Sequence, residues 1–250
     1  MDTNARTTFF KMEIRHEGFT LVELVLAMVI STIIAAAVFA AYTAQQRTYL
    51  AQEQVAELQQ NLRAGMDILT RELRTAGFDP TGNVGATIIT ADPGHIEFTK
   101  DITDAAGTGD SNGVLDHPSE WLDFGFSAAV GNDADRNGIP DTGGVLPLSR
   151  QTRLPPPAVP SGYQTLVENI QAIELHYLDE DGNTLPAPID PGDIRAVQVS
   201  LLARAGRPDE NFQNNNATYT AASGATWGPY NDNFRRRLSI MTVQTRNMGL

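Results

Sequence analysis

The stretch G-F-T-L-V-E, residues 18–23, opens an apolar run that continues to Ala41. From residue 24 to Ala41 this run contains no charged side chain. A helix over residues 19–42 rises ~1.5 Å per residue and spans about 35 Å, which is enough for one crossing of a bilayer. The sequence therefore predicts a membrane-spanning helix that begins close to Gly18.

The flanking charges predict how this helix is oriented. Lys11 and Arg15 lie just before the run, and the next basic residue is Arg47. The positive-inside rule then places residues 1–18 in the cytoplasm and the rest of the chain outside it. A secretory signal is cut after its apolar run, whereas the candidate cleavage point here, between Gly18 and Phe19, lies before it. We therefore expect the apolar run to stay in the mature protein, and Met1 and Met12 are both candidate starts of the leader.

Glu23 is the one charged residue within the apolar segment. A carboxylate in a membrane costs roughly 2.5–3.5 kcal/mol on insertion scales, so it needs a partner. Cleavage after Gly18 would give Phe19 a free amine, whose positive charge is unfavourable at a helix N-terminus. Glu23 can offset that charge in its own chain or in an adjacent subunit.

The helical pattern continues beyond the apolar run. Apolar residues recur at spacings of three and four and predict one buried stripe: Val55, Leu58, Leu62, Met66, Leu69, Leu73 and Ala76. Gly77 fits a helix C-terminus and Pro80 blocks continuation, so we expect one helix from Phe19 to Ala76. Packing of this stripe on a compact domain is favoured over a coiled-coil stalk, because strand-like segments follow.

The remainder of the chain predicts a β-rich domain with long loops. We expect strands at residues 95–99, 121–127, 170–178, 194–203 and 238–245. Residues 209–233 form a polar insertion with few core candidates. Antiparallel pairing, with one sheet face on the amphipathic half of the helix, gives an α+β fold. The expected organisation is a leader at 1–18, a membrane segment at 19–42, an amphipathic helix at 43–77 and a globular domain at 78–250.

Composition excludes several functions. The 250 residues carry a net charge of -12, which argues against nucleic acid as a partner. The chain has no cysteine, so it has neither disulfides nor thiolate sites. Ser111 lies in a literal G-x-S-x-G, but no alternation of strands and helices surrounds it to make a nucleophile elbow. We expect a protein that is not an enzyme.

G-F-T-L-V-E with its apolar run resembles the class III signal of type IV prepilins and type II secretion pseudopilins. The resemblance implies that a membrane prepilin peptidase cuts between Gly18 and Phe19 and methylates the new amine of Phe19. It also implies that Glu23 neutralises the N-terminus of a neighbouring subunit during assembly.

Three further segments resemble PilW-type minor pilins: residues 71–80, 166–182 and 235–247. The mid-helix proline and the C-terminal cysteine pair of many major pilins are both missing, and their absence favours a minor subunit. The resemblance implies a pilin-like fold and partners that include other minor and major pilins, contacted through the N-terminal helix. It places the protein in the inner membrane, with a single pass and the globular domain outside, and then in the pilus at the cell surface.

The segment N-D-A-D-R-N-G-I-P-D, residues 132–141, has the spacing of a calcium loop. Asp133, Asp135, Asn137 and Asp141 occupy its first, third, fifth and ninth places, and the carbonyl of Ile139 is a further candidate ligand. Gly144 stands where an EF-hand has glutamate, so a single calcium-stabilised loop is expected and an EF-hand is not. An Asx-rich surface turn explains the same residues equally well. Ca²⁺ is thus the one candidate cofactor.

These features predict a minor pilin that primes, caps or enters a type IV pilus. Two alternatives stay open. One is a minor pseudopilin of a type II secretion system, which would carry the same signal. The other is a signal-anchored adhesin or binding module that depends on calcium and does not polymerise.

Overall fold

The computed structural model describes residues 18–127, 132–153 and 161–248. The expected leader therefore lies outside the described residues, except for Gly18. The chain divides into two compact units, residues 1–50 and residues 51–250, which are described separately below. One helix, α1 (Leu21–Leu73), contributes to both units.

Helix α1 ends by a change of hydrogen-bond partners. The last α-helical residue is Leu73, three residues before the predicted end, and residues 75 and 76 donate to carbonyls three residues back. The N–H of Gly77 then bonds to the carbonyl oxygen of Thr99, at 2.9 Å. Gly77 has φ 75°, and a Cβ there would lie 2.7 Å from the sulfur of Met248. The helix thus stops where its next N–H pairs with a strand and where only glycine fits.

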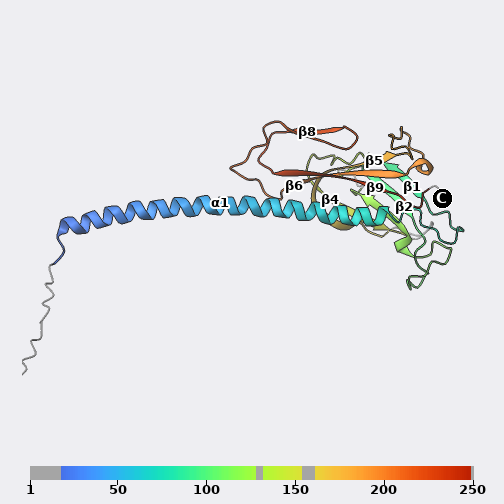
Figure 1. The fold of residues 1–250 in the computed structure, drawn as a ribbon, viewed down its shortest axis with the longest axis horizontal. Coiled ribbons are helices and arrows are strands. Elements are labelled where there is room, and N and C mark those ends of the chain that lie inside the picture. Colours follow the sequence, from blue (N-terminus) through green and yellow to red (C-terminus); the bar gives the residue numbers. More distant parts are fainter. Residues whose placement is uncertain (1–17, 128–131, 154–160, 249–250) are drawn as a thin grey trace, which may run out of the picture. The chain divides into compact units, whose positions relative to one another are not determined.

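Seven strands of the second unit form one antiparallel sheet in the order β1-β2-β3-β4-β5-β6-β9 (Figure 1). These strands are β1 (Ile88–Asp92), β2 (His95–Thr99), β3 (Trp121–Gly125), β4 (Leu146–Thr152), β5 (Gln164–Leu178), β6 (Ala196–Arg204) and β9 (Arg236–Gln244). A hairpin of β7 (Ala217–Thr220) and β8 (Thr226–Tyr230) forms a second sheet. Two single 3₁₀ turns, η1 (Pro118–Glu120) and η2 (Pro191–Asp193), precede β3 and β6.

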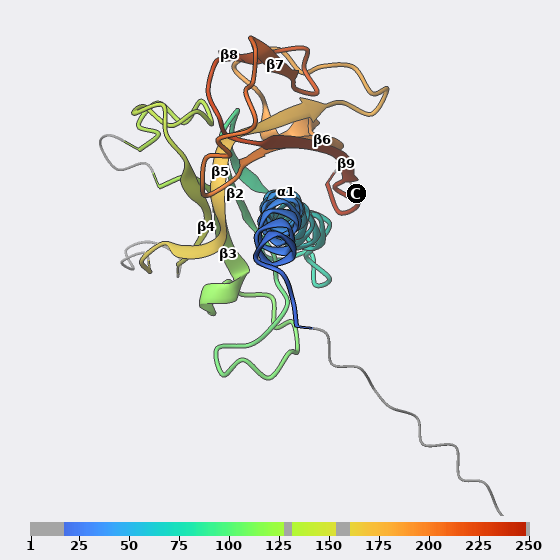
Figure 2. The ribbon, with the colours of Figure 1, turned by 90° about the vertical axis from the view of Figure 1, so that its left-hand side faces the viewer.

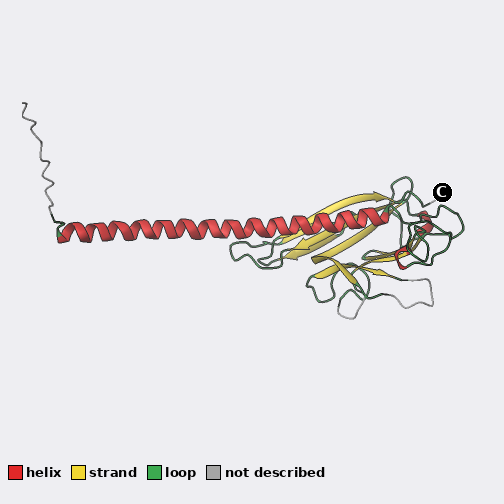
Figure 3. Cartoon of the chain, turned by 90° about the horizontal axis from the view of Figure 1, so that it is seen from below, coloured by secondary structure: helices red, strands yellow, loops and turns green. Residues whose placement is uncertain are grey.

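The amphipathic part of α1 packs on one face of the seven-stranded sheet (Figures 2 and 3). Every residue of the predicted stripe from Leu58 to Ala76 is buried, whereas Val55 at its start is half-buried. Gly65 lies at the closest approach, since a Cβ there would be 3.2 Å from Leu201 on β6 and 3.3 Å from Val167 on β5. The predicted α+β fold, a long N-terminal helix on an antiparallel sheet, is confirmed.

The structure adds elements that the sequence pattern did not indicate. Strands β1 and β4 are short and mixed in composition, and both are paired along the sheet. The polar insertion at 209–233 contains the β7–β8 hairpin, which covers the sheet face opposite α1 (Figure 1). A second apolar cluster lies beneath it, made of Ala172, Leu202, Ala221 and Trp227.

A buried arginine joins this hairpin to the sheet. The side chain of Arg236 is 1 % exposed, and its guanidinium donates two hydrogen bonds of 2.6 Å to the two carboxylate oxygens of Asp232. It also donates to Gln171 on β5 and lies 3.9 Å from the ring centre of Tyr230. The hydrogen bonds from Arg236 lower the pKa of Asp232 to about 2.

The first prediction concerns the helix–sheet contact. Leu69 is fully buried, so Leu69→Ala leaves a cavity between α1 and the sheet, and we expect a loss of about 2–5 kcal/mol in the free energy of unfolding. The measurement is urea unfolding of the full chain in detergent. The matched control is Val114→Ala, because Val114 is 54 % exposed in a loop and should change stability by less than about 0.5 kcal/mol. Equal losses in the two variants would contradict this packing.

The second prediction concerns acid stability. The pKa of Asp232 is lowered in the folded protein, so its stabilising effect is complete above the unfolded pKa of ~3.9 and disappears as the pH falls through about 2. We expect Asp232→Asn to be less stable than the parent protein at pH 5, with the difference shrinking between pH 4 and pH 2. Urea unfolding across this range measures it, and a difference that stays constant with pH would contradict the pairing with Arg236.

Candidate functional site

The start of α1 is a capping box. The backbone N–H and the hydroxyl of Thr20 donate to Oε2 of Glu23, at 2.8 and 2.9 Å, and the N–H of Glu23 donates back to Oγ1 of Thr20 at 3.2 Å. These bonds satisfy backbone groups that the first turn of a helix leaves without partners. The T-x-x-E spacing within G-F-T-L-V-E is a known signature of this motif, so the sequence contained a signal for it beyond the charge of Glu23.

This cap uses only one oxygen of Glu23. Among the described residues Oε1 has no hydrogen-bond partner, and Glu23 is exposed. Glu23 is therefore able to cap its own helix and to receive a cation from outside the chain. Gly18 and Phe19 precede the helix, and Phe19 is 92 % exposed.

The first unit exposes an apolar surface on all sides of the helix. Large apolar side chains from Leu21 to Phe39 are exposed by about half or more of their area. Helix α1 is long and apolar enough to cross a membrane. A contiguous apolar surface of this kind marks contact with lipid or with other protein chains.

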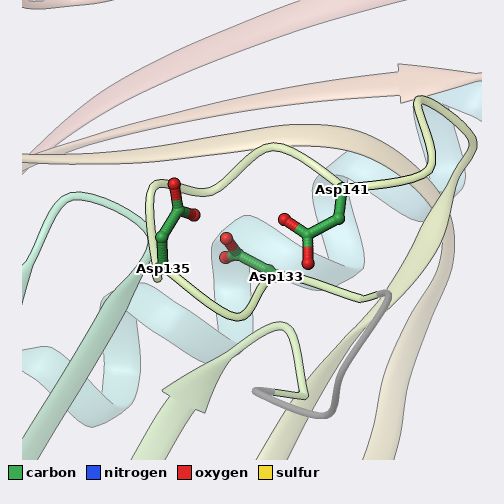
Figure 4. A group of neighbouring side chains, drawn as sticks. All are labelled: Asp133, Asp135 and Asp141. Carbon is green, nitrogen blue, oxygen red and sulfur yellow. The ribbon is translucent and has the colours of Figure 1, made fainter.

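The acidic loop between β3 and β4 brings three carboxylates together. Asp133, Asp135 and Asp141 each place a carboxylate oxygen within 4.8 Å of the others (Figure 4). Asp135 and Asp141 are exposed, whereas Asp133 is 1 % exposed. The structure thus brings together three of the side chains that the sequence indicated.

Backbone contacts hold this loop against the sheet. The N–H of Ile173 on β5 donates to the carbonyl oxygen of Gly138 at 2.9 Å, and the N–H of Gly94 donates to that of Arg136 at 2.8 Å. A Cβ on Gly138 would overlap the carbonyl oxygen of Ile173, and a Cβ on Gly94 would overlap the backbone of Gly138. Glycine is therefore required on both sides of the contact, and Gly138 also has φ 80°.

The surroundings of Asp133 disfavour the charged form of its carboxyl group. Its Oδ2 accepts from the N–H of Gly138 at 3.0 Å, whereas its Oδ1 is buried without a partner among the described residues. Burial, followed by the negative charge of Asp135, raises the pKa of Asp133. The spacing of the motif indicated the ligands, but it did not show that the first of them would be buried.

The two other predicted ligands take local roles in the loop. The side-chain oxygen of Asn137 accepts from the N–H of Ile139 at 2.7 Å, and its amide nitrogen donates to Asp135 at 2.7 Å. The side chain of Ile139 is exposed. The metal-ligand roles of Asn137 and Ile139 stay predictions.

A second acidic loop is held mainly by hydrogen bonds to two carboxylates, those of Asp101 and Glu120. In residues 110–116, Ser111 and Gly113 donate to Asp101, at 2.7 and 2.9 Å. Buried Glu120 accepts four backbone N–H groups, from residues 102, 103, 116 and 117. The carboxylates of Asp101 and Glu120 are thus used by the loop itself, whereas Oδ1 of Asp116, like Oδ1 of Asp133, is buried without a hydrogen-bond partner among the described residues.

Residues 15–39 match the family model for the prokaryotic N-terminal methylation motif. The chain therefore carries the prokaryotic N-terminal methylation motif over these residues. The class III signal predicted from the sequence is thereby confirmed on this segment. The match contains Gly18, Phe19 and Glu23 but does not test their individual roles.

A type IV-like pilin from Thermus thermophilus is among the solved structures that match. The two sequences are 16 % identical, and the TM-score of the two structures is 0.42. The match covers 77 % of this chain and 97 % of the Thermus chain. The sequence has no significant match among curated proteins.

The third prediction tests how the acidic loop docks. Gly94→Ala places a methyl group in the backbone of Gly138, so the loop or the β1–β2 turn must move, and we expect a loss of about 1–3 kcal/mol in the free energy of unfolding. The matched control is Gly162→Ala, because a Cβ at Gly162 meets nothing within 4 Å. Urea unfolding compares the two, and a Gly94→Ala protein as stable as the control would refute the docking.

Proposed function

We propose that this protein is a minor pilin of a type IV pilus. In this proposal a prepilin peptidase cuts between Gly18 and Phe19 and methylates the amine of Phe19. Before assembly, residues 19–42 anchor the mature subunit in the inner membrane, and residues 78–250 lie outside the cytoplasm. It then joins other minor and major pilins through α1, to prime or cap the fibre or to become part of it, and so reaches the cell surface.

The apolar surface of the first unit carries the proposal. Its side chains are exposed on every side of the helix and meet no partner within the described chain. Lipid covers such a surface in the membrane, and helices of neighbouring subunits cover it in a fibre. Transfer between the two environments keeps the apolar side chains away from water throughout, so assembly does not require the large cost of exposing them.

Glu23 makes contact with other subunits more favourable for this helix than contact with lipid. Its carboxylate costs free energy in a bilayer, and the capping box with Thr20 relieves only part of that cost because Oε1 stays unpaired. The N-terminal amine of an adjacent mature subunit supplies the missing positive charge. The ion pair between Glu23 and this amine forms only when the two helices are in the correct register. Neutralisation of the two charges therefore depends on ordered assembly.

A minor pseudopilin of a type II secretion system would use the same processing and the same helix, and it remains the alternative within the family. The two proposals differ in what the subunit assembles into. Loss of surface pili in a deletion strain supports the pilus, whereas loss of protein secretion with normal pili supports the pseudopilin.

The fourth prediction separates assembly from anchoring. Glu23→Ala should leave the protein in the membrane fraction but reduce its amount in sheared fibres by at least about tenfold, because the N-terminal charge of the neighbour is no longer neutralised. Quantitative immunoblotting of both fractions measures this. The control is Glu57→Ala, because Glu57 is exposed on the amphipathic part of α1 and should be incorporated normally. Normal incorporation of Glu23→Ala would favour a plain membrane anchor.

A second pair of variants tests cleavage of the leader. Gly18→Val should keep the leader attached, which intact-mass measurement detects as the added mass of the leader. Gly162→Val serves as the control and should be cleaved normally, since it lies far along the chain in open space. Cleavage of Gly18→Val between residues 18 and 19 would contradict the proposed processing site.

A further inference from the structure

We propose that Asp133, Asp135 and Asp141 bind one calcium ion that fastens the acidic loop to the sheet. This site is separate from the processing and assembly machinery of α1. The proposal is therefore independent of the function proposed above, and it stands or fails on its own measurements.

The first support is the convergence of the carboxylates. Oxygens that share one Ca²⁺ at 2.3–2.6 Å lie no more than roughly 5 Å apart, whichever side of the ion they occupy. One oxygen from each of the three aspartates meets this limit, with all three within 4.8 Å of one another (Figure 4). The residues come from both ends of the loop, so a shared ion would close it.

The second support is the buried oxygen of Asp133. This side chain is 1 % exposed, and its Oδ1 has no hydrogen-bond partner among the described residues. Figure 4 shows the Asp133 carboxylate directed toward the group formed with Asp135 and Asp141. A buried carboxylate oxygen without a donor is costly, and a cation in this group would remove that cost.

The third support is the distribution of charge. No lysine or arginine pairs with the three carboxylates in the part of the chain that the structure describes. The nearest cationic side chain in the loop, Arg136, instead contacts Asp92 at 3.4 Å. The three carboxylates thus lie close together without a paired protein cation among the described residues, and a divalent ion would offset their mutual repulsion.

The donor set favours calcium over other divalent ions. All the candidate ligands are oxygens, which suits hard cations and not zinc or copper. They lie in an irregular loop with exposed positions that water can complete, and Ca²⁺ accepts such flexible geometry with six to eight ligands, whereas Mg²⁺ requires a near-ideal octahedron.

The ion would act as a structural clamp. The loop accepts one backbone hydrogen bond from Gly94 in the β1–β2 turn and one from Ile173 on β5, and Arg136 adds a side-chain contact with Asp92. By joining Asp133 to Asp141, calcium would hold the intervening turn in the shape that these two bonds need. Binding to the folded state alone then raises the stability of the whole second unit.

The experiment uses the full chain in detergent, first stripped with EDTA and then supplied with CaCl₂ or MgCl₂. We expect a single calcium ion per chain by isothermal titration calorimetry, with a Kd of about 0.1–1 mM as in extracellular calcium modules. At a calcium concentration of about 100 times Kd, Tm should rise by about 5–10 °C. The same concentration of MgCl₂ should produce less than half of this rise.

Variants locate the site. Asp135→Asn and Asp141→Asn alter exposed side chains and keep an oxygen that can accept the backbone hydrogen bonds of the loop, so they should fold normally and weaken calcium binding at least tenfold. Asp133→Asn should do the same, but its burial makes the two exposed variants the decisive ones. The matched control is Asp110→Asn, because Asp110 is exposed in the other acidic loop, and it should bind calcium like the parent protein.

The proposal is overturned if Tm is the same in EDTA and in 10 mM CaCl₂. It is also overturned if Asp135→Asn, Asp141→Asn and Asp110→Asn respond to calcium equally. An equal response to MgCl₂ and CaCl₂ would overturn the assignment to calcium.

Discussion

The burial of one helical stripe against one sheet face organises the second unit of this protein. The buried residues from Leu58 to Ala76 pack on side chains of the sheet, and strands β4, β5 and β6 lie close to α1 at Gly65. Gly65 sets how closely the two layers approach, and Gly77 ends the helix where its N–H pairs with β2. The sheet in turn positions everything attached to it, including the acidic loop and the β7–β8 hairpin.

The apolar residues of α1 are buried in the second unit and exposed in the first. In the second unit its apolar residues are hidden by the chain's own sheet, and its polar residues face outward. In the first unit the apolar residues are exposed in the part of the chain that the structure describes. A single helix therefore combines an element of a folded domain with an apolar segment that the described residues leave exposed.

Much of this organisation follows from sequence patterns that are strong and local. The three–four spacing predicted the buried stripe, because this period reflects burial on one side of a helix. Short alternating or aromatic runs predicted strands at the positions of β2, β3, β5 and β6, and a final strand was predicted at the position of β9. The β7–β8 hairpin was missed because its anchors are distributed: Trp227 and Ala221 pack on Leu202, from the far face of a strand expected to bury one side only. Asp133, Asp135 and Asp141 were identified from spacing alone, but the burial of Asp133 depends on Gly94 and Ile173, which lie tens of residues away in sequence.

The capping box at Thr20 also determines what a processing enzyme would encounter. Because the cap fixes the first helical residue at Leu21, the bond between Gly18 and Phe19 lies outside the helix by two residues. A peptide bond must leave regular helical geometry to enter the active site of a protease, and here no unwinding is needed. In the proposed processing, Thr20 and Glu23 thus fix where the helix begins, so that the bond after Gly18 lies before the first helical residue.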